Sequence, residues 1–466
     1  MGNLISSLVL AANAMDVEQK AVGVVQNNVT NASTPGYVNQ TPTFIAGAFD
    51  PQTGTTGGVL FGPVESSRSQ FAESEVRSQN SLLGTATQAA ASLNALQQEF
   101  SVSGTTGIPA ALSNLYSAFS AWSTTPTDES NQQQVIVAAQ QVAEAFNDTA
   151  SSITQIASNT QGQLQDTVNQ INALTGQIQQ INVQIRNSGG GDNDAGLDAQ
   201  LNADLESLSN LTNIDVHYQS DGTAEVLMGG QIPLVIGATQ NQLKVTYSTP
   251  PNPANANAPP AATITTPDGQ DVTSTVSQGT LAGLLTFTNG TLAGIMGDSQ
   301  NAGSLNQLAT AFANQVNSIV TPVSGIPLFT TSATPTDAAQ TLAVNTKMTA
   351  ATLVASSATS SNGTADQLAQ LGSFSDPVLG AGYTDFYANI ASAIGNQESA
   401  ASANQTTQQA LLTQAQNART QLSGVSLNQS ATQLIEFQQA YDASAQTVTT
   451  INNMLTALLD MTNGVP

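Results

Sequence analysis

The sequence of 466 residues contains no cysteine, and this absence excludes several kinds of site. A disulfide framework, a thiolate zinc site and a thiol nucleophile all require cysteine. Basic residues are also rare, because 7 Lys and Arg stand against 31 Asp and Glu and give a net charge of −24. Proteins that bind nucleic acid or an anionic membrane surface need a basic surface, so we expect neither partner.

Long hydrophobic runs are missing as well. The sequence has no run of about eighteen apolar residues, so we expect no insertion into a membrane. The N-terminus does not look like a cleaved secretory signal, because its first basic residue is Lys20 and polar residues such as Asn13 interrupt the apolar run. An exported protein of this kind would need another route. The only histidine, His217, has no acid–serine pairing beside it, and the sequence predicts no enzyme, no cofactor and no metal.

What the sequence does contain is a helical repeat at its C-terminal end. Apolar residues recur every seven positions, and a second row follows three positions after the first. Spacings of three, four and seven place such side chains on one stripe of a helix. We predict a coiled-coil-forming helix over 423–466 with the stripe Leu427, Leu434, Phe437, Tyr441, Val448, Ile451, Leu455 and Leu458.

A similar repeat begins the chain. We predict a coiled-coil-forming helix over 1–33, and its stripe consists of Leu4, Leu8, Met15, Val22, Val25 and Val29. A helix with one apolar stripe is marginal alone and needs a partner surface. We expect the two terminal helices to pair with each other and with neighbouring subunits, so that both stripes form an assembly seam. The alternative is that each helix packs on a separate globular core.

The residues between these helices predict a rod. We expect a helical bundle domain over 34–213, beginning with a loop over 34–70, and a return segment of that domain over 279–422. Between them, residues 214–278 alternate apolar and polar side chains with Gly-containing turns, which is typical of a small inserted β domain. The predicted fold class is α+β and mainly α: an elongated rod with paired terminal helices, a long-helix bundle and strands at its far end.

A cluster of acids is the one candidate metal site. Asp192, Asp194 and Asp198 surround Gly196, and alternating acids beside glycine resemble a calcium loop. Acids at the N-terminus of a helix, interacting with its dipole, are the favoured explanation. A glycosidase would need a pair of facing carboxylates, and the spacing of the acids nominates none.

Three stretches resemble the flagellar axial proteins, the family of rod, hook and junction subunits. The first runs from Asn27 to Gln40, the second from Gly424 to Tyr441, and the third from Gly283 to Phe287. The family usually has Arg where Asn39 stands, so a salt bridge from that position is not expected. The motif turn that the resemblance identifies consists of Asn31, Pro35, Gly36, Tyr37 and Gln40.

The resemblance implies a structural role without catalysis, joining hook to filament in the bacterial flagellum outside the cell. It implies export through the flagellar type III apparatus without a cleaved signal peptide. Implied partners are further copies of the chain, hook protein, hook-associated protein 3 and an export chaperone. The alternatives are another axial protein, such as one of hook type, and an extracellular adhesin on a helical stalk.

Overall fold

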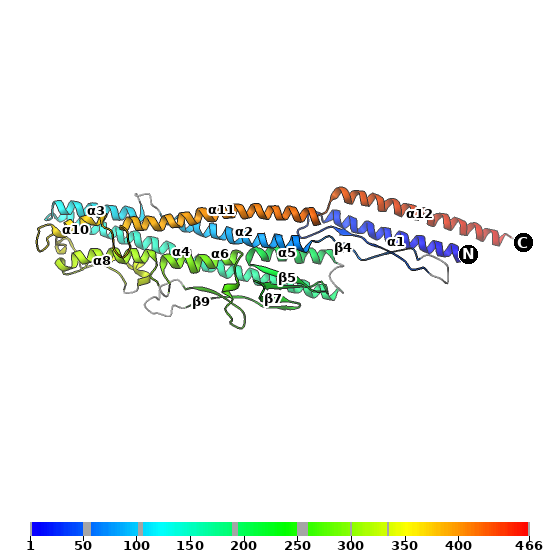
Figure 1. Cartoon of the computed structure of the whole chain (residues 1–466), viewed down its shortest axis with the longest axis horizontal. Coiled ribbons are helices and arrows are strands. Elements are labelled where there is room, and N and C mark those ends of the chain that lie inside the picture. Colours follow the sequence, from blue (N-terminus) through cyan, green and yellow to red (C-terminus); the bar gives the residue numbers. More distant parts are fainter. Residues whose placement is uncertain are drawn as a thin grey trace.

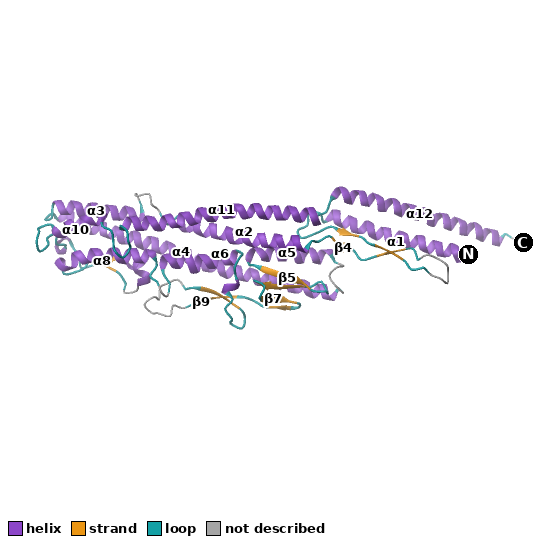
Figure 2. Cartoon of the chain, in the orientation of Figure 1, coloured by secondary structure: helices purple, strands orange, loops and turns teal. Residues whose placement is uncertain are grey.

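The computed structural model describes residues 2–49, 57–100, 106–188, 194–248, 260–298, 301–332 and 335–464. The chain forms an elongated rod, and both of its ends lie at the same tip (Figure 1). Helices make up most of the rod, and short strands lie beside them (Figure 2). The predicted fold class, α+β and mainly α, is confirmed.

The long helices follow the periodicity of the sequence. α1 spans Gly2–Thr30 and α12 spans Leu427–Asn463, within the two predicted terminal ranges. α4 spans Glu129–Asn187, and the Asp128 carboxylate caps it by accepting from the Ser130 N–H at 2.8 Å. The other α-helices are α2 (Gln70–Gln97), α3 (Gly107–Thr124), α5 (Ala195–Leu211), α6 (Thr280–Thr286), α7 (Ala293–Met296), α8 (Ser304–Ser324), α9 (Ala338–Thr341), α10 (Gly363–Ala369) and α11 (Tyr383–Ser423). Shorter helical turns are η3 (Thr273–Thr275), η4 (Phe287–Leu292), η5 (Pro335–Asp337), η6 (Ala350–Thr352) and η7 (Gln370–Ser373).

The strands form small antiparallel sheets. One sheet has the order β5 (Ile214–Tyr218), β6 (Ala224–Met228), β7 (Ile232–Ile236) and β8 (Thr239–Gln240). The two-stranded pairs are β1 (Gln40–Thr41) with β4 (Glu65–Ser66), β2 (Phe44–Ala46) with β3 (Val59–Phe61), β9 (Lys244–Tyr247) with β10 (Ala262–Thr265), and β11 (Phe329–Thr330) with β12 (Ala343–Val344). The turn between β6 and β7 uses Gly229 and Gly230 at φ 58° and 69°, a left-handed conformation that glycine adopts without strain.

Two hydrophobic cores follow one another along the rod. The first lies at the tip away from the chain ends and joins α3, the first half of α4, α8, α10 and the start of α11 (Figure 1). Its largest fully buried side chains include Trp122, Phe146 and Phe312. The second core joins the second half of α4 to α5, α6 and the strands β5–β7, β9 and β10. The long α4 belongs to both cores and so connects them.

The strands of the predicted β domain do not lie at the far end of the rod, and this part of the expectation is wrong. The strands within 214–278 lie along the flank of α4 and α5, and the far tip consists mainly of helices together with the short β11–β12 pair (Figure 1). Residues 214–278 share the second core with the helices, because the inward side chains of β6 pack in one cluster with Ile178 and Ile185 of α4. Alternation in a sequence shows that one face of a strand is buried, but it does not identify the covering element.

Asparagine side chains attach strands and loops to the helices. The Asn182 amide donates to the Ala224 carbonyl at 2.8 Å, and its oxygen accepts from the Ala224 N–H at 2.9 Å. Such paired bonds satisfy a backbone donor and acceptor that would otherwise be buried without partners. The same two-bond arrangement joins Asn28 to Gln40, Asn172 to Leu243, Asn289 to Ala262 and Asn317 to Phe329. In a chain with few charges, these neutral contacts position the β segments.

Candidate assembly interface

The two terminal helices lie side by side and run antiparallel, as the predicted pairing requires (Figure 1). We call α1 and α12 together the terminal pair. On α1 the covered apolar side chains are Val17, Ala21 and Val25, which are spaced by four and therefore share one face. The polar Asn28 near the end of α1 is buried as well. On α12 the covered side chains are Ser430 and Ile451. The pair thus buries few residues for its length, unlike the two cores of the rod.

The predicted stripe residues fall into three groups within the chain. Val25 and Ile451 are buried. Half-buried residues are Leu4, Leu8, Met15, Val22, Leu434, Phe437, Tyr441, Val448 and Leu455. Val29, Leu427 and Leu458 are 42%, 55% and 37% exposed, and each lies close to an end of its helix. A straight helix drifts by about 20° per heptad, so a strict seven-residue repeat leaves a flat contact toward its ends.

Uncovered apolar side chains are concentrated at this tip of the rod. Of the nineteen large hydrophobic residues that are exposed in the described ranges, thirteen belong to α1, α12 or the segment that follows α1. They are Ile5, Val9, Val29, Phe44, Ile45, Phe49, Leu60, Leu427, Ile435, Met454, Leu458, Leu459 and Met461. Exposed apolar side chains gathered in one region are typical of interaction sites.

The β2–β3 ribbon packs against the terminal pair. The ring of Phe44 on β2 lies 5.8 Å from the ring of Phe437 on α12, in a tilted arrangement. Gly58, at φ 71°, approaches the side chain of Leu10 on α1 so closely that a Cβ would lie 3.3 Å from it. The ribbon therefore covers part of both helices. Its cross-strand neighbours Ile45 and Leu60 remain about half exposed.

The motif turn carries the chain from α1 toward the body of the rod. Gly36 has φ 75°, and a Cβ at this position would lie 2.2 Å from the carbonyl oxygen of Ala199 on α5. Only glycine fits this close approach, so the turn is anchored on α5. Asn31 donates to the Asn27 side chain at 2.6 Å, and Pro35 is exposed.

The last two motif residues converge on Asn28. The Tyr37 hydroxyl donates to the Asn28 side-chain oxygen at 2.9 Å. The Gln40 N–H donates to the same oxygen at 2.9 Å, and the Asn28 amide donates to the Gln40 carbonyl at 2.7 Å. Both Asn28 and Gln40 are buried. These residues fix the turn, and Asn28 is a member of this site that the sequence did not single out.

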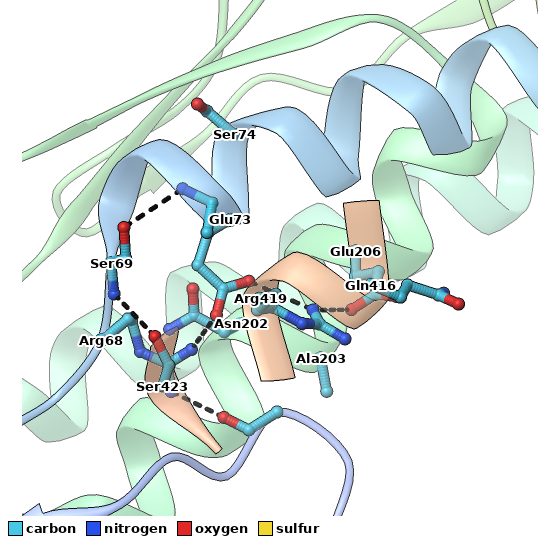
Figure 3. Close-up of polar contacts among 12 residues, drawn as sticks. Arg68, Ser69, Glu73, Ser74, Asn202, Ala203, Glu206, Gln416, Arg419 and Ser423 are labelled. Atoms are coloured by element: carbon cyan, nitrogen blue, oxygen red, sulfur yellow. Dashed lines mark hydrogen bonds and ion pairs between the residues drawn. The ribbon is translucent and has the colours of Figure 1, made fainter. Parts of the chain in front are cut away.

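An ion cluster lies where the terminal pair meets the body of the rod, and Figure 3 shows its labelled side chains. The Arg68 guanidinium contacts Glu73 at 2.6 Å and Asp198 at 2.7 Å. The Arg419 guanidinium contacts Glu206 at 2.6 Å and the second oxygen of Glu73 at 3.2 Å. These five residues, the joint cluster, connect α2, α5 and α11. Burial lowers the pKa of Arg419, but the hydrogen bond and charge of Glu206 outweigh burial and raise it overall.

Ser423 attaches the end of α11 to the segment leading from α1. Its carbonyl accepts from the Asn39 N–H at 2.9 Å and from the Ser67 hydroxyl at 3.1 Å. Its hydroxyl accepts from the Ser69 N–H at 3.1 Å. α11 ends at this residue, and Gly424 begins the short break before α12. The terminal pair is therefore fastened to the rod at one narrow joint.

The candidate calcium acids have other roles where the structure describes them. Asp194 caps α5 by accepting from the N–H groups of Gly196 and Leu197, and Asp198 pairs with Arg68. Asp192 lies outside the described residues. Within the described ranges no group of three or more potential metal-ligating side chains comes together. In the same ranges, no helix is both long and apolar enough to cross a membrane.

Sequence reasoning missed the joint cluster, although the chain held a signal for it. Only four arginines occur, Arg68, Arg77, Arg186 and Arg419. Two of them belong to the joint cluster, and Arg77 follows Glu73 by one helical turn on α2. In so acidic a chain, scarce arginines are expected at positions where a carboxylate must be held in place.

Comparisons with known proteins give consistent results. A family model described as the flagellar hook-associated protein FlgK helical domain matches residues 93–322. A second, described as the flagellar basal body rod FlgEFG protein C-terminal, matches residues 416–461. Flagellar hook-associated protein 1 of Bacillus subtilis (strain 168) is 25% identical over 503 residues, covering 99% of each chain.

One solved structure also aligns with the chain. It is the flagellar hook junction protein FlgK from Burkholderia pseudomallei, with a TM-score of 0.47 and 25% sequence identity. The alignment covers 56% of this chain and 47% of that chain, so the match spans about half the length of the solved protein.

Proposed function

We infer that this chain belongs to the flagellar hook-associated protein family and is a structural subunit of the junction between hook and filament. The two family matches and the relative that aligns along the whole length support this role. Proteins of this family have a structural role, and we therefore propose no enzymatic activity for this chain. The bacterial flagellum is accordingly where this protein works.

The concentration of bare apolar side chains on the terminal pair carries the proposal. Burying one Val, Leu, Ile or Phe side chain stabilises a structure by roughly 1.5–3 kcal/mol. The terminal pair buries few such residues within one chain and leaves Ile5, Val9 and Ile435 about half exposed. Neighbouring subunits would cover these side chains, so that assembly completes the packing that folding begins. A head-to-tail contact of this kind generates a ring or a helical array.

The partners proposed for this surface are those implied by the resemblance to the flagellar axial proteins. We propose that the terminal pair contacts further copies of the chain, hook protein on one side and hook-associated protein 3 on the other. An export chaperone would cover α12 before assembly, because Leu459 and Met461 are otherwise open to nonspecific association. Export would follow the flagellar type III route to a position outside the cell.

The decisive experiment changes one bare residue of α12. Ile435→Asp places a charge where a neighbouring subunit is expected, and Ile435 is 55% exposed in the single chain. We expect helix content and melting temperature of the monomer to remain unchanged, while assembly measured by sedimentation and junction formation measured by motility are lost. Gln438→Asp, one turn further on an exposed position, adds the same charge and should retain assembly.

Normal assembly of the Ile435→Asp protein would show that α12 is not the contact surface. Limited proteolysis gives an independent measurement on the unmodified chain. Residues 1–33 and 425–460 should gain protection in the assembled form, whereas α4 should be protected in both forms. Equal protection of the terminal pair before and after assembly would contradict the proposal.

A second function is supported by one observation. The C-terminal match at 416–461 is to rod-type axial proteins, so a tubular axial subunit of hook type remains the alternative. The two functions differ in the length of the assembly. A junction subunit is expected to form short rings on a hook end, whereas a hook-type subunit would form long tubes by itself, which electron microscopy distinguishes.

A further inference from the structure

Arg77 is a buried cation that has no hydrogen-bond or ion-pair partner among the described residues. Its side chain on α2 is 6% exposed, and one terminal nitrogen, Nη1, is shielded from solvent with no acceptor in reach. Neither an ion pair nor a hydrogen bond joins its guanidinium to another described residue. A buried charge without a partner is costly, and proteins rarely keep one without a use.

The acids nearest in sequence do not satisfy Arg77. Glu73 precedes it by one helical turn, but Arg68 and Arg419 occupy the two carboxylate oxygens of Glu73. Glu75 faces solvent, where its carboxylate accepts from the Gln79 amide at 2.9 Å. The guanidinium of Arg77 therefore has no carboxylate partner among the described residues, and its planar N–H donors suit a carboxylate, which binds such donors in pairs.

Arg77 lines an open pocket of about 780 Å³. The pocket lies between α2, β5, the β6–β7 turn and the segment after η3. Most of its lining is polar, and the side chains of Ser78, Gln231 and Ser277 form no hydrogen bond with the rest of the described chain. These hydroxyl and amide groups can donate to the same ligand as Arg77. The pocket thus gathers unused donors around one buried positive charge.

Three titratable groups stand at the rim of this pocket: Glu75, Asp215 and His217. All three are exposed. Their charges act through water and salt, which screen them over about 8 Å at physiological ionic strength. The charge of Arg77 acts in a buried setting, where a contact is far stronger. A carboxylate that reaches the guanidinium is therefore attracted despite the acids at the rim.

We propose that the Arg77 pocket receives an acidic side chain from a neighbouring copy of this chain. We choose a second copy as the partner because its charge complements the Arg77 cation: each copy has 31 Asp and Glu against 7 Lys and Arg. The inference rests on the proposed function, since assembly is what brings a second copy to the pocket. It adds a specific polar contact on the body of the rod to the apolar contacts of the terminal pair.

The test replaces Arg77 with an uncharged side chain of similar length. Arg77→Met removes a buried unpaired charge, so the isolated monomer should unfold at equal or higher urea concentration than the unmodified protein. The concentration needed for assembly should rise by about tenfold or more, the effect of losing one charge-assisted contact. Arg186→Met is the matched control, because Arg186 is exposed and makes no ion pair in the described chain. It should change neither quantity.

Opposite results would overturn the proposal. A less stable Arg77→Met monomer with unchanged assembly would make Arg77 a structural residue only. If Arg77→Met fails to fold, the unmodified monomer is titrated with sodium acetate, and the side-chain Nε resonance of Arg77 is followed by NMR against sodium chloride at equal ionic strength. A saturable shift with acetate alone supports the pocket, and equal shifts with both salts contradict it.

A second variant separates this proposal from the proposed function. Asp215→Asn removes a rim charge and should ease assembly at low salt, but only while Arg77 is present. If Asp215→Asn eases assembly equally in the Arg77→Met protein, the Asp215 charge does not act through the Arg77 pocket. If the unmodified and Arg77→Met proteins begin to assemble at the same concentration, the proposed role of the pocket is refuted while the proposed function stands. If the unmodified chain does not assemble at all, the proposed function fails, and the acetate titration still judges the pocket.

Discussion

Glu73 holds two arginines at once: Arg68 is its near neighbour in sequence, and Arg419 comes from a distant part of the chain. Arg419 lies 346 positions away, and Arg68 itself reaches Asp198 across 130 positions. The Glu73 side chain is 4% exposed, so its charge is removed from water and depends on both guanidinium groups. The joint between the rod and the terminal pair therefore depends on one buried carboxylate.

Replacing Glu73 should weaken the folded state strongly. Glu73→Gln leaves Arg68 and Arg419 without their shared anion, and removal of one partner from a buried ion pair costs about 3 kcal/mol. Urea denaturation followed by circular dichroism measures the loss. Glu75→Gln is the control, because Glu75 is exposed two residues later and should change stability by less than about 0.5 kcal/mol. Equal effects of the two variants would refute a special role for the cluster.

The stability of α1 is expected to depend on pH through the carboxyl group of Glu18. Burial raises the pKa of this carboxyl above its ordinary value, and one of its oxygens has no hydrogen-bond partner. A raised pKa in the folded state means that stability is greatest below the unfolded pKa of about 4.5 and falls as the pH rises through the folded pKa.

Glu18→Gln should therefore slow hydrogen exchange in α1 at pH 7 and have no such effect at pH 4. The amide cannot ionise, so the variant keeps the packing of the protonated form at every pH. Asp16→Asn is the control, since Asp16 is exposed and pairs with Lys20 at 2.7 Å. Slower exchange of the Glu18→Gln protein at both pH values would point to a cause other than ionisation.

At the scale of elements, local patterns predicted the helices well and their contacts less well. The seven-residue repeat from Leu427 to Leu455 predicted α12, and its pairing with α1 is confirmed. The repeat did not reveal that Leu427 would be bare, because burial depends on the length of helix that α1 covers. Arg68 and Arg419 gave no periodic signal either, since an ion pair requires no spacing in sequence. The assembly seam across copies stays a prediction.

The position of the β segments on the helices could likewise not be predicted from local sequence patterns. Alternation over 214–236 predicted β5, β6 and β7, but their place on α4 depends on Asn182, a polar residue within an apolar stripe. Asn182→Leu should cost about 1–3 kcal/mol, because the Ala224 N–H and carbonyl lose their partner in a buried site. Thermal unfolding measures this, with the exposed Asn169→Leu as control. A neutral outcome for Asn182→Leu would mean that the strands are held by packing alone.

For the whole molecule, the net charge of −24 opposes association between copies. Raising ionic strength from about 0.01 M to 0.15 M shortens the range of this repulsion from about 30 Å to 8 Å. Apolar contacts of the terminal pair do not weaken with salt, so the concentration required for assembly should fall. Light scattering at matched pH measures the change. Assembly that weakens with added salt would show that charge pairs, and not apolar side chains, dominate the contact.

The antiparallel terminal pair takes its two helices from opposite ends of the polypeptide. Translation produces α1 early and α12 last, so a molecule interrupted anywhere between them shows only half of the joining surface. Under the proposed function, such an incomplete subunit lacks half of the contact surface and is not expected to be incorporated.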